Sequence, residues 1–470
     1  ETENFKSSAG EKEIFVTGDN ITFNDDASNT TIVVTDELTP GSITFDNNSK
    51  DYIVEGTGSL VGNAMLTKKG EANVTINNVN KLTGGIYLQA GKLNVSTLSN
   101  SDGVEYGALG GVDNPIVFSG GTLGVNATTV SSQNINIDSN GIIETTGAAR
   151  LTHNGSIDGS KKQLTKTGTG TLILNGTAKY GTLTIEQGNV QVGEISDVHQ
   201  YPDTVVLNGG TLKDPDNIYS YSTNNTTVVV PEGKKASWTL DSRCDYKGKL
   251  LGKGEVTVNV TSVRCTMQGD WSQFEGTINF QKQKTGNYDP QILWDNSKGM
   301  PKATVTGEFD NNGKNVTIGT ILGNATLTGS GTYTANGLSL KVTRVRGNSS
   351  NTMIEVSGTL SVTDNITVTW TGTKPKLGEE VTLWKVGRLS TSTNIVLNLP
   401  ELPTGLYWDT TDLLKSEGKL RVTDDPSLGI SGVYMDNRQN GKTYTLSGMP
   451  IENPNQKGIY IRNGKKIVIK

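Results

Sequence analysis

Cysteine, histidine and aromatic residues are scarce in this chain, and their scarcity limits the chemistry it can perform. The 470 residues include two cysteines and two histidines, and aromatic residues make up 6%. Two cysteines and the distant His153 and His199 form no ligand set for zinc, so no metal site is expected. Neither histidine lies beside a serine or cysteine motif, and no G-x-S-x-G is present, so a catalytic triad is not expected.

Long apolar runs and helical periodicity are also missing. No apolar stretch approaches the roughly 18 residues that a membrane-spanning helix needs, so no transmembrane segment is expected. The glycine-rich segments do not match the G-x-x-x-x-G-K-[ST] loop that cradles nucleotide phosphates. Glycine shows no Gly-X-Y period, which excludes collagen.

Positive charge is concentrated at one end of the chain. The formal net charge is −5, but residues 432–470 carry seven basic and two acidic side chains, which leaves −10 for the remainder. An acidic body argues against nucleic acid as the main partner. The basic tail indicates a small module with a separate role.

Glycine and alternating apolar residues are what the chain has in excess. There are 57 glycines, and in Leu164–Gly193 they divide short β-runs whose apolar residues alternate with Thr and Asn. Variants of this phrase return at Ser119–Val125 and Ser357–Val362. A phrase that returns at short intervals indicates a repeat architecture, in which each unit buries its apolar face by stacking on the next.

The spacing of glycine-flanked leucines predicts the fold. Intervals of 21–22 residues alternate with intervals of 29–30 that imply loop insertions: Leu60–Leu82, Leu151–Leu172 and Leu338–Leu360, then Leu93–Leu123 and Leu183–Leu212. About 21–22 residues accommodate three short strands and three turns, which predicts an all-β, right-handed parallel β-helix (a solenoid). Tandem β-sandwiches are the alternative, but they need units of about 100 residues.

These patterns divide the chain into four parts. We expect a parallel β-helix over residues 1–374, a closing β segment over 375–423, a linker over 424–431 and a small C-terminal β module over 432–470. Asn463–Gly464 within the last part is a strong hairpin signal between two strands.

The two cysteines are separated by one repeat. Cys265 follows Cys244 by 21 residues, and equivalent positions on neighbouring rungs have Cα atoms about 4.8 Å apart, inside the disulfide range. The spacing therefore predicts a disulfide, which suits an oxidising, exported context. Two unrelated buried thiols are the alternative.

Three segments resemble secreted bacterial proteins. Leu164–Gly193 resembles the autotransporter-associated β-strand repeat of surface passengers, and Tyr246–Phe280 and Leu399–Val422 look like parts of large secreted β-helix proteins. The resemblance implies an exported, cell-surface or secreted adhesin-like or structural protein that contacts glycans or host polymers and has no identifiable active site.

The tail Tyr444–Lys470 is similar to the C-terminal sorting modules of Bacteroidetes exported proteins. Its matching positions include Gly448, Gly458, Tyr460, Lys466 and Lys470. This resemblance implies export by a type IX-like route, with the secretion machinery as a partner of the module.

An enzyme is the alternative, because polysaccharide lyases and glycoside hydrolases commonly use β-helices. Asp241, Arg243 and Asp245 alternate and so share one face of a strand, and Asp270 lies about one rung further on. Such a cluster would serve a lyase, which could also use calcium. The alternative is an exposed strand held by salt bridges.

Aromatic residues between Asp214 and Pro301 are candidates for stacking on sugars. The candidates for this carbohydrate-binding face are Trp238, Trp294, Tyr288, Tyr219 and Tyr221. The alternative is a core role, which we expect for Trp271 and Phe274, because bulky aromatic residues are usually buried.

Overall fold

The chain is all-β. The computed structural model describes residues 5–7, 9–195, 198–215, 222–241, 243–261, 263–285, 287–345, 348–393, 395–430, 443–445, 450–451, 458–462 and 465–469. These residues form strands, turns and loops without any helix, and so none that could cross a membrane. The chain divides into two compact units, residues 1–244 and 245–470.

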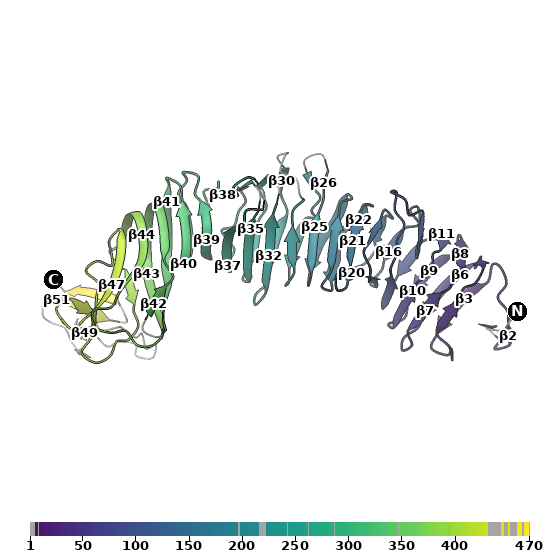
Figure 1. Cartoon of the computed structure of the whole chain (residues 1–470), viewed down its shortest axis with the longest axis horizontal. Helices are drawn as coiled ribbons and strands as arrows, with labels where there is room; N and C mark the ends of the chain where they lie inside the picture. Colours follow the sequence, from purple (N-terminus) through teal and green to yellow (C-terminus); the bar gives the residue numbers. More distant parts are fainter. Residues whose placement is uncertain are drawn as a thin grey trace. The chain divides into compact units, whose positions relative to one another are not determined.

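Most strands of the first unit belong to three series of parallel pairs (Figure 1). The first series is β3 (Asn20–Asn24), β6 (Ser42–Asp46), β9 (Met65–Lys68), β12 (Ile86–Leu88), β16 (Ile116–Phe118), β19 (Ile135–Ile137), β22 (Ile157–Thr167) and β24 (Ala178–Ile185). The second is β4 (Thr31–Val33), β7 (Tyr52–Glu55), β10 (Asn73–Ile76), β13 (Lys92–Val95), β17 (Thr122–Val125) and β20 (Gly141–Thr145), continued through β22 and β24 to β28 (Thr204–Leu207) and β31 (Thr227–Val230). The third begins with β5 (Glu37–Leu38), β8 (Ser59–Gly62) and β11 (Lys81–Leu82), and resumes with β18 (Thr129–Ser131), β21 (Arg150–His153), β23 (Thr171–Leu174), β25 (Asn189–Val192), β29 (Thr211–Lys213) and β32 (Lys235–Leu240).

In two of the five leucine intervals the two leucines lie opposite each other on neighbouring strands. Leu151 pairs with Leu172, and Leu93 pairs with Leu123 across the longer interval. A spacing of 21 residues and one of 30 therefore both connect neighbouring strands, and the longer interval does contain an insertion.

In the other three intervals the two leucines do not lie opposite each other. Each leucine pairs with a different residue: Leu82 with Gly62, Leu183 with Val205, and Leu338 with Ile366. The physical reason is that the turns differ in length, so equal spacing along the chain does not guarantee that two residues lie opposite each other.

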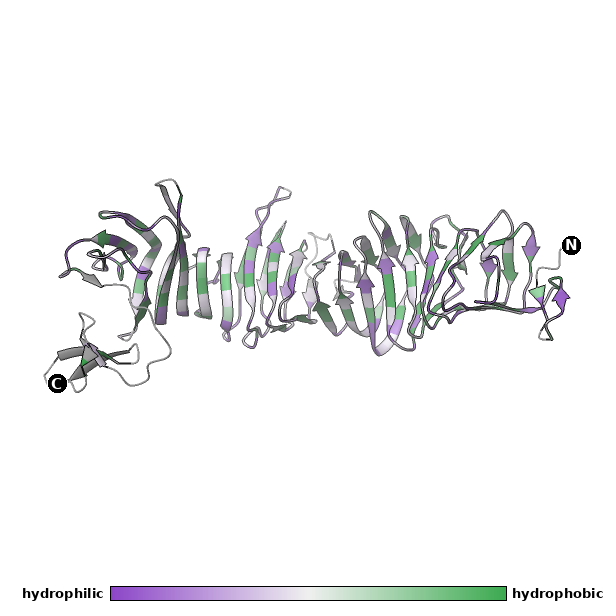
Figure 2. Ribbon diagram, turned by 90° about the horizontal axis from the view of Figure 1, so that it is seen from below, coloured by the Kyte–Doolittle hydropathy of each residue, from purple (hydrophilic) through white to green (hydrophobic). Residues whose placement is uncertain are grey.

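Alternation along each strand separates the core from the surface. In β10, Val74 and Ile76 are fully buried, whereas Asn73 and Thr75 are partly exposed. Figure 2 shows the resulting alternating bands of hydrophobic and hydrophilic residues along the strands. Successive strand residues point to opposite faces, so parallel stacking builds continuous columns of buried Val, Ile and Leu.

The second unit begins with parallel pairs and ends with antiparallel ones. Its parallel strands are β35 (Glu255–Val260), β36 (Arg264–Met267), β37 (Thr277–Lys282), β38 (Gln291–Trp294), β39 (Met300–Asp310), β40 (Val316–Thr328), β41 (Thr332–Val345), β43 (Ile354–Gly372) and β45 (Val396–Asn398). β44 (Glu380–Thr391) pairs parallel with β43 but antiparallel with β47 (Glu417–Thr423). β46 (Tyr407–Asp409) then pairs antiparallel with both β47 and β48 (Gly429–Ile430).

Aromatic rings form the core of the second unit. Trp271 stacks on Phe280 with ring centroids 6.2 Å apart, and Phe309 lies 4.9 Å from Phe280. Trp294 meets Trp271 edge-on at 5.5 Å. Trp271 is 1% exposed and Phe274 is 0% exposed, which confirms the core role expected for both.

A small antiparallel sheet stands at the C-terminal end of the chain. It contains β49 (Thr443–Thr445), β50 (Pro450–Ile451), β51 (Gly458–Arg462) and β52 (Lys465–Ile469). Arg462 pairs with Lys465, which confirms the predicted hairpin between β51 and β52. Of the predicted sorting positions, Gly458 and Tyr460 lie in β51 and Lys466 in β52, whereas Gly448 and Lys470 lie outside the described residues.

The predicted disulfide is wrong. Cys244 and Cys265 are both buried thiols, and no disulfide joins them. In a parallel stack, equivalent Cβ atoms on neighbouring strands stay about 4.8 Å apart, whereas a disulfide brings its Cβ atoms to about 3.8 Å. Residues separated by one repeat therefore do not reach bonding geometry by stacking alone.

Candidate functional site

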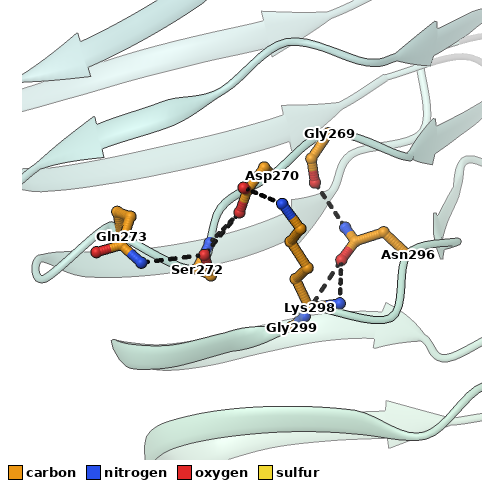
Figure 3. Close-up of polar contacts among 7 residues, drawn as sticks. All are labelled: Gly269, Asp270, Ser272, Gln273, Asn296, Lys298 and Gly299. Carbon is orange, nitrogen blue, oxygen red and sulfur yellow. Dashed lines mark hydrogen bonds and ion pairs between the residues drawn. The ribbon is translucent and has the colours of Figure 1, made fainter.

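Asp270, the best acid–base candidate of the second unit, is held in a dense polar network (Figure 3). Its carboxylate accepts hydrogen bonds from the backbone N of Ser272 at 3.1 Å and from Ser272 Oγ at 2.7 Å. Lys298 Nζ lies 2.5 Å from the other carboxylate oxygen. Since the loop residues 268–276 contain Asp270 and the turn after β38 contains Lys298, the ion pair connects two consecutive turns.

Asn296 strengthens the same connection between the turns. Its Nδ2 donates to the carbonyl of Gly269 at 2.7 Å, and its Oδ1 accepts from the backbone N of Lys298 at 2.9 Å (Figure 3). The buried ring of Trp294 donates from Nε1 to the carbonyl of Asn296 at 3.0 Å. The network therefore fixes a turn to the aromatic core.

These contacts determine the proton affinity of Asp270. Hydrogen bonds from Lys298 and then from Ser272 lower the pKa of its carboxyl to about 2. A general base works best when its pKa lies near the operating pH. Asp270 is thus an anchored carboxylate and a poor proton acceptor.

The remaining acid–base candidates are divided between the two units. Asp241 and Arg243 belong to the first unit and Asp245 to the second. Asp241 forms an ion pair with Lys213 at 3.2 Å, and Arg243 and Asp245 are partly exposed. Within the described residues, no group of three or more His, Cys, Asp or Glu side chains is arranged to hold a metal ion.

Two of the predicted sugar-stacking residues lie in the core instead. Trp238 is 2% exposed and Trp294 is 0% exposed, so neither ring presents a face to a ligand, because the apolar core takes up the large aromatic surfaces. Tyr288 is 52% exposed and remains accessible. Tyr219 and Tyr221 lie outside the described residues.

An open groove of about 440 Å³ lies on the outer surface of β37, β39 and β40 in the second unit. Gly307 is one of the residues that line it. Most of the others have amide or charged side chains: Asn279, Gln281, Lys282, Gln283, Glu308 and Asn324. Lys282 and Glu308 form an ion pair along it. An amide offers both donors and an acceptor, so this lining can hydrogen-bond to a ligand rich in hydroxyl groups.

Irregular backbone shapes this groove. The register between β39 and β40 shifts at Val305 and Gly307, as in a β-bulge. Gly307 has φ +86°, and a Cβ there would meet the carbonyl oxygen of Phe280 at 1.8 Å. Asn324 has φ +66°, in the left-handed region that asparagine adopts more readily than most non-glycine residues. Bulges are over-represented next to active sites, which makes this groove the best binding candidate of the second unit.

Sequence reasoning missed the groove, although it contained one signal. The alternation in Thr277–Lys282 predicts that Asn279 and Gln281 point outward, and both line the groove. The bulge at Gly307 is visible only in the pairing of β39 with β40.

No family of known proteins matches this sequence, and no curated protein or solved structure is significantly similar to it.

Proposed function

We propose that the protein is an exported adhesin-like or structural passenger that contacts glycans or host polymers through its polar outer surface. The observation that carries this proposal is the groove on β37, β39 and β40, which is shallow, open and lined by amides. Two of the three carboxylates that would serve an enzyme are instead engaged in ion pairs: Asp241 with Lys213, and Asp270 with Lys298.

The strand pairing supports a right-handed parallel β-helix as the architecture of this passenger. The three series of parallel pairs in the first unit return at short intervals, as three-stranded coils would. Such a fold repeats outward polar positions along the sheets. Repetition suits weak contacts that gain strength by multivalency, because a second contact forms at a high effective concentration.

The groove would bind hydroxyl-rich polymers weakly. Gln281 and Asn324 are exposed and Asn279 is partly exposed, so their amides can exchange water for ligand hydroxyls with a net gain of about 0.5–1.5 kcal/mol for each hydrogen bond. Phe280, the aromatic ring nearest the groove, is 1% exposed and cannot stack on a sugar. We therefore expect specificity for hydrogen-bonding pattern and low affinity for a single site.

The test is a glycan array followed by titration of any bound polymer. The variant Gln281→Ala with Asn279→Ala should reduce binding at least about tenfold, the effect of losing roughly one or two hydrogen bonds. Thr75→Ala, on an outward strand position of the first unit, is the matched control and should leave binding unchanged. Equal binding by both variants would place the contact elsewhere.

The same polymers should be screened for turnover. Formation of unsaturated products or new reducing ends by the unaltered protein, and its loss in Asp241→Asn or Asp270→Asn, would refute the passenger proposal. The protein would then be a polysaccharide lyase or glycoside hydrolase that uses residues 214–301. Calcium should be included, because a lyase could require it.

We further propose that residues 432–470 direct export through a type IX-like machinery. Strands β49–β52 of this segment pair with one another in a separate antiparallel sheet. Deleting residues 432–470 in a Bacteroidetes host should retain the protein inside the cell envelope, whereas normal surface display of the shortened chain would refute a sorting role.

A further inference from the structure

Two lysines of the first unit are buried, although lysine is normally exposed. Lys68 and Lys166 are each 0% exposed, and burial lowers the pKa of each to about 8. A buried ammonium needs hydrogen-bond partners to offset its lost hydration. Neither lysine forms an ion pair within the described residues, so their partners must be sought among uncharged groups.

Backbone carbonyls supply those partners. Lys166 Nζ donates to the carbonyls of Thr167 at 2.5 Å, Gly168 at 2.7 Å and Gln187 at 3.3 Å. Lysine has three N–H donors, so the three carbonyls match the ammonium one for one. Thr167 and Gly168 belong to the turn that follows the lysine, whereas Gln187 belongs to the turn after β24, the next parallel strand.

Lys68 repeats the arrangement almost 100 residues earlier. Its Nζ donates to the carbonyl of Gly70 in its own turn and to that of Ala90 at 3.4 Å. Ala90 lies in the turn after β12, the strand that pairs with β9. In both cases one ammonium therefore connects two consecutive turns.

A glycine completes each arrangement. Gly91 and Gly188 directly follow the residue of the second turn whose carbonyl accepts the hydrogen bond, and they have φ +59° and +73°. A Cβ at Gly91 would meet Lys68 Nζ at 2.7 Å, and one at Gly188 would meet Lys166 Nζ at 3.0 Å. Glycine thus leaves space for the ammonium as well as permitting the turn.

The sequence around the two lysines is also shared. Both lie in the phrase L-T-K-x-G, at residues 66–70 and 164–168, and in each the second glycine follows the lysine by 22 or 23 residues. The two copies share the phrase, the glycine and the contacts of one ammonium with two consecutive turns, although Lys166 has one carbonyl partner more than Lys68. They therefore indicate one structural arrangement used twice.

We propose that L-T-K-x-G encodes an internal cation site: a cage of turn carbonyls, filled by the chain's own ammonium, that clamps each turn to the turn of the next parallel strand. Carbonyl oxygens that converge at a turn repel one another and cannot all bond within the strand ladders. A cation at their centre offsets this repulsion, and the lysine stem delivers it from the apolar core.

Removal of the ammonium should loosen the two turns. Lys68→Met and Lys166→Met keep the apolar stem, and hydrogen exchange at residues 68–72 with 88–92, or 166–170 with 185–189, should accelerate at least about tenfold. The controls are Lys69→Met and Lys162→Met, neighbouring lysines that are exposed. Exchange as slow as in the controls would overturn the clamp.

Rescue tests the cage itself. Lys166→Ala leaves a space that n-propylammonium, the missing end of the side chain, should enter. We expect n-propylammonium chloride, compared with tetramethylammonium chloride, to slow exchange at these turns in Lys166→Ala but not in Lys162→Ala. Equal effects of the two salts would mean that no cation cage exists.

Labelling of the unaltered protein keeps the proposal testable if the variants do not fold. With limiting acetylating reagent, Lys68 and Lys166 should react at least about tenfold more slowly than Lys69 and Lys162, because burial shields both amines from the reagent and outweighs the larger neutral fraction that their lowered pKa gives them. Equal labelling rates would contradict the buried, bonded ammonium.

Discussion

His153 should make the first unit sensitive to acid. The residue ends β21, is 1% exposed, and pairs in register with Ser131 and Leu174. Among the described residues, no group forms a hydrogen bond with its Nε2. Burial lowers the pKa of His153 from 6.5 to about 4, opposed by a hydrogen bond with the Ser156 backbone.

The sign and size of the effect follow from these two values. Well above pH 6.5 the imidazole is neutral in both states, so His153 causes no pH dependence there. Between pH 6.5 and about 4, His153 is protonated in the unfolded chain but stays neutral in the folded chain. The free energy of unfolding therefore falls as the pH decreases, until the pH reaches about 4. The full difference corresponds to about 3 kcal/mol.

The assay is urea unfolding at several values between about pH 7.5 and pH 4. His153→Asn retains a side-chain donor but cannot be protonated, so its free energy of unfolding should fall less steeply than that of the unaltered protein. His199→Asn controls for loss of a histidine, and the carboxylates that titrate near pH 4 are common to all variants. Parallel loss of stability in the His153→Asn variant and the unaltered protein would refute the reasoning.

Three further predictions concern other parts of the chain. Asp270→Asn should lower the free energy of unfolding by at most about 1 kcal/mol near neutral pH, and this contribution, present above the usual carboxyl pKa of 3.8, should vanish as the pH falls towards 2; a loss unchanged by acid would contradict it. Phe280→Ala removes a ring that packs on two others and should cost about 3–5 kcal/mol in urea unfolding, whereas the adjacent outward Gln281→Ala should cost less than about 0.5 kcal/mol. Thiol titration of denatured, unreduced protein should find both Cys244 and Cys265 reactive, and a result of no free thiol would mean that a disulfide joins them after all.

The local alternation of apolar and polar residues made the strands predictable, but the register between paired strands could not be predicted from it. The outward and inward positions of β10 or β37 follow from a period of two, which depends only on the strand itself. Pairing of Leu183 with Val205 depends on the lengths of the turns between them. Two leucine intervals matched the register because those turns preserve it, and three did not.

Residue type alone was a poor guide to the candidate site. Trp238 and Trp294 have the chemistry to stack on sugars, yet the core buries both. The groove is lined instead by Asn279, Gln281 and Asn324, common residues that acquire meaning only when a bulge places them around Gly307. No motif marks such a site, because its residues come from three strands.

The order of residues alone determines that this chain forms β-strands, glycine turns and an apolar face on each strand, because β-propensity and the alternation of apolar residues act over a few positions. Tertiary structure decided which turns stack, and hence that the thiols of Cys244 and Cys265 remain separate and that Lys68 and Lys166 are buried. In the sequence these lysines resemble any surface cation. They are buried because carbonyls from a turn about twenty residues away complete the hydrogen bonds that water would otherwise supply.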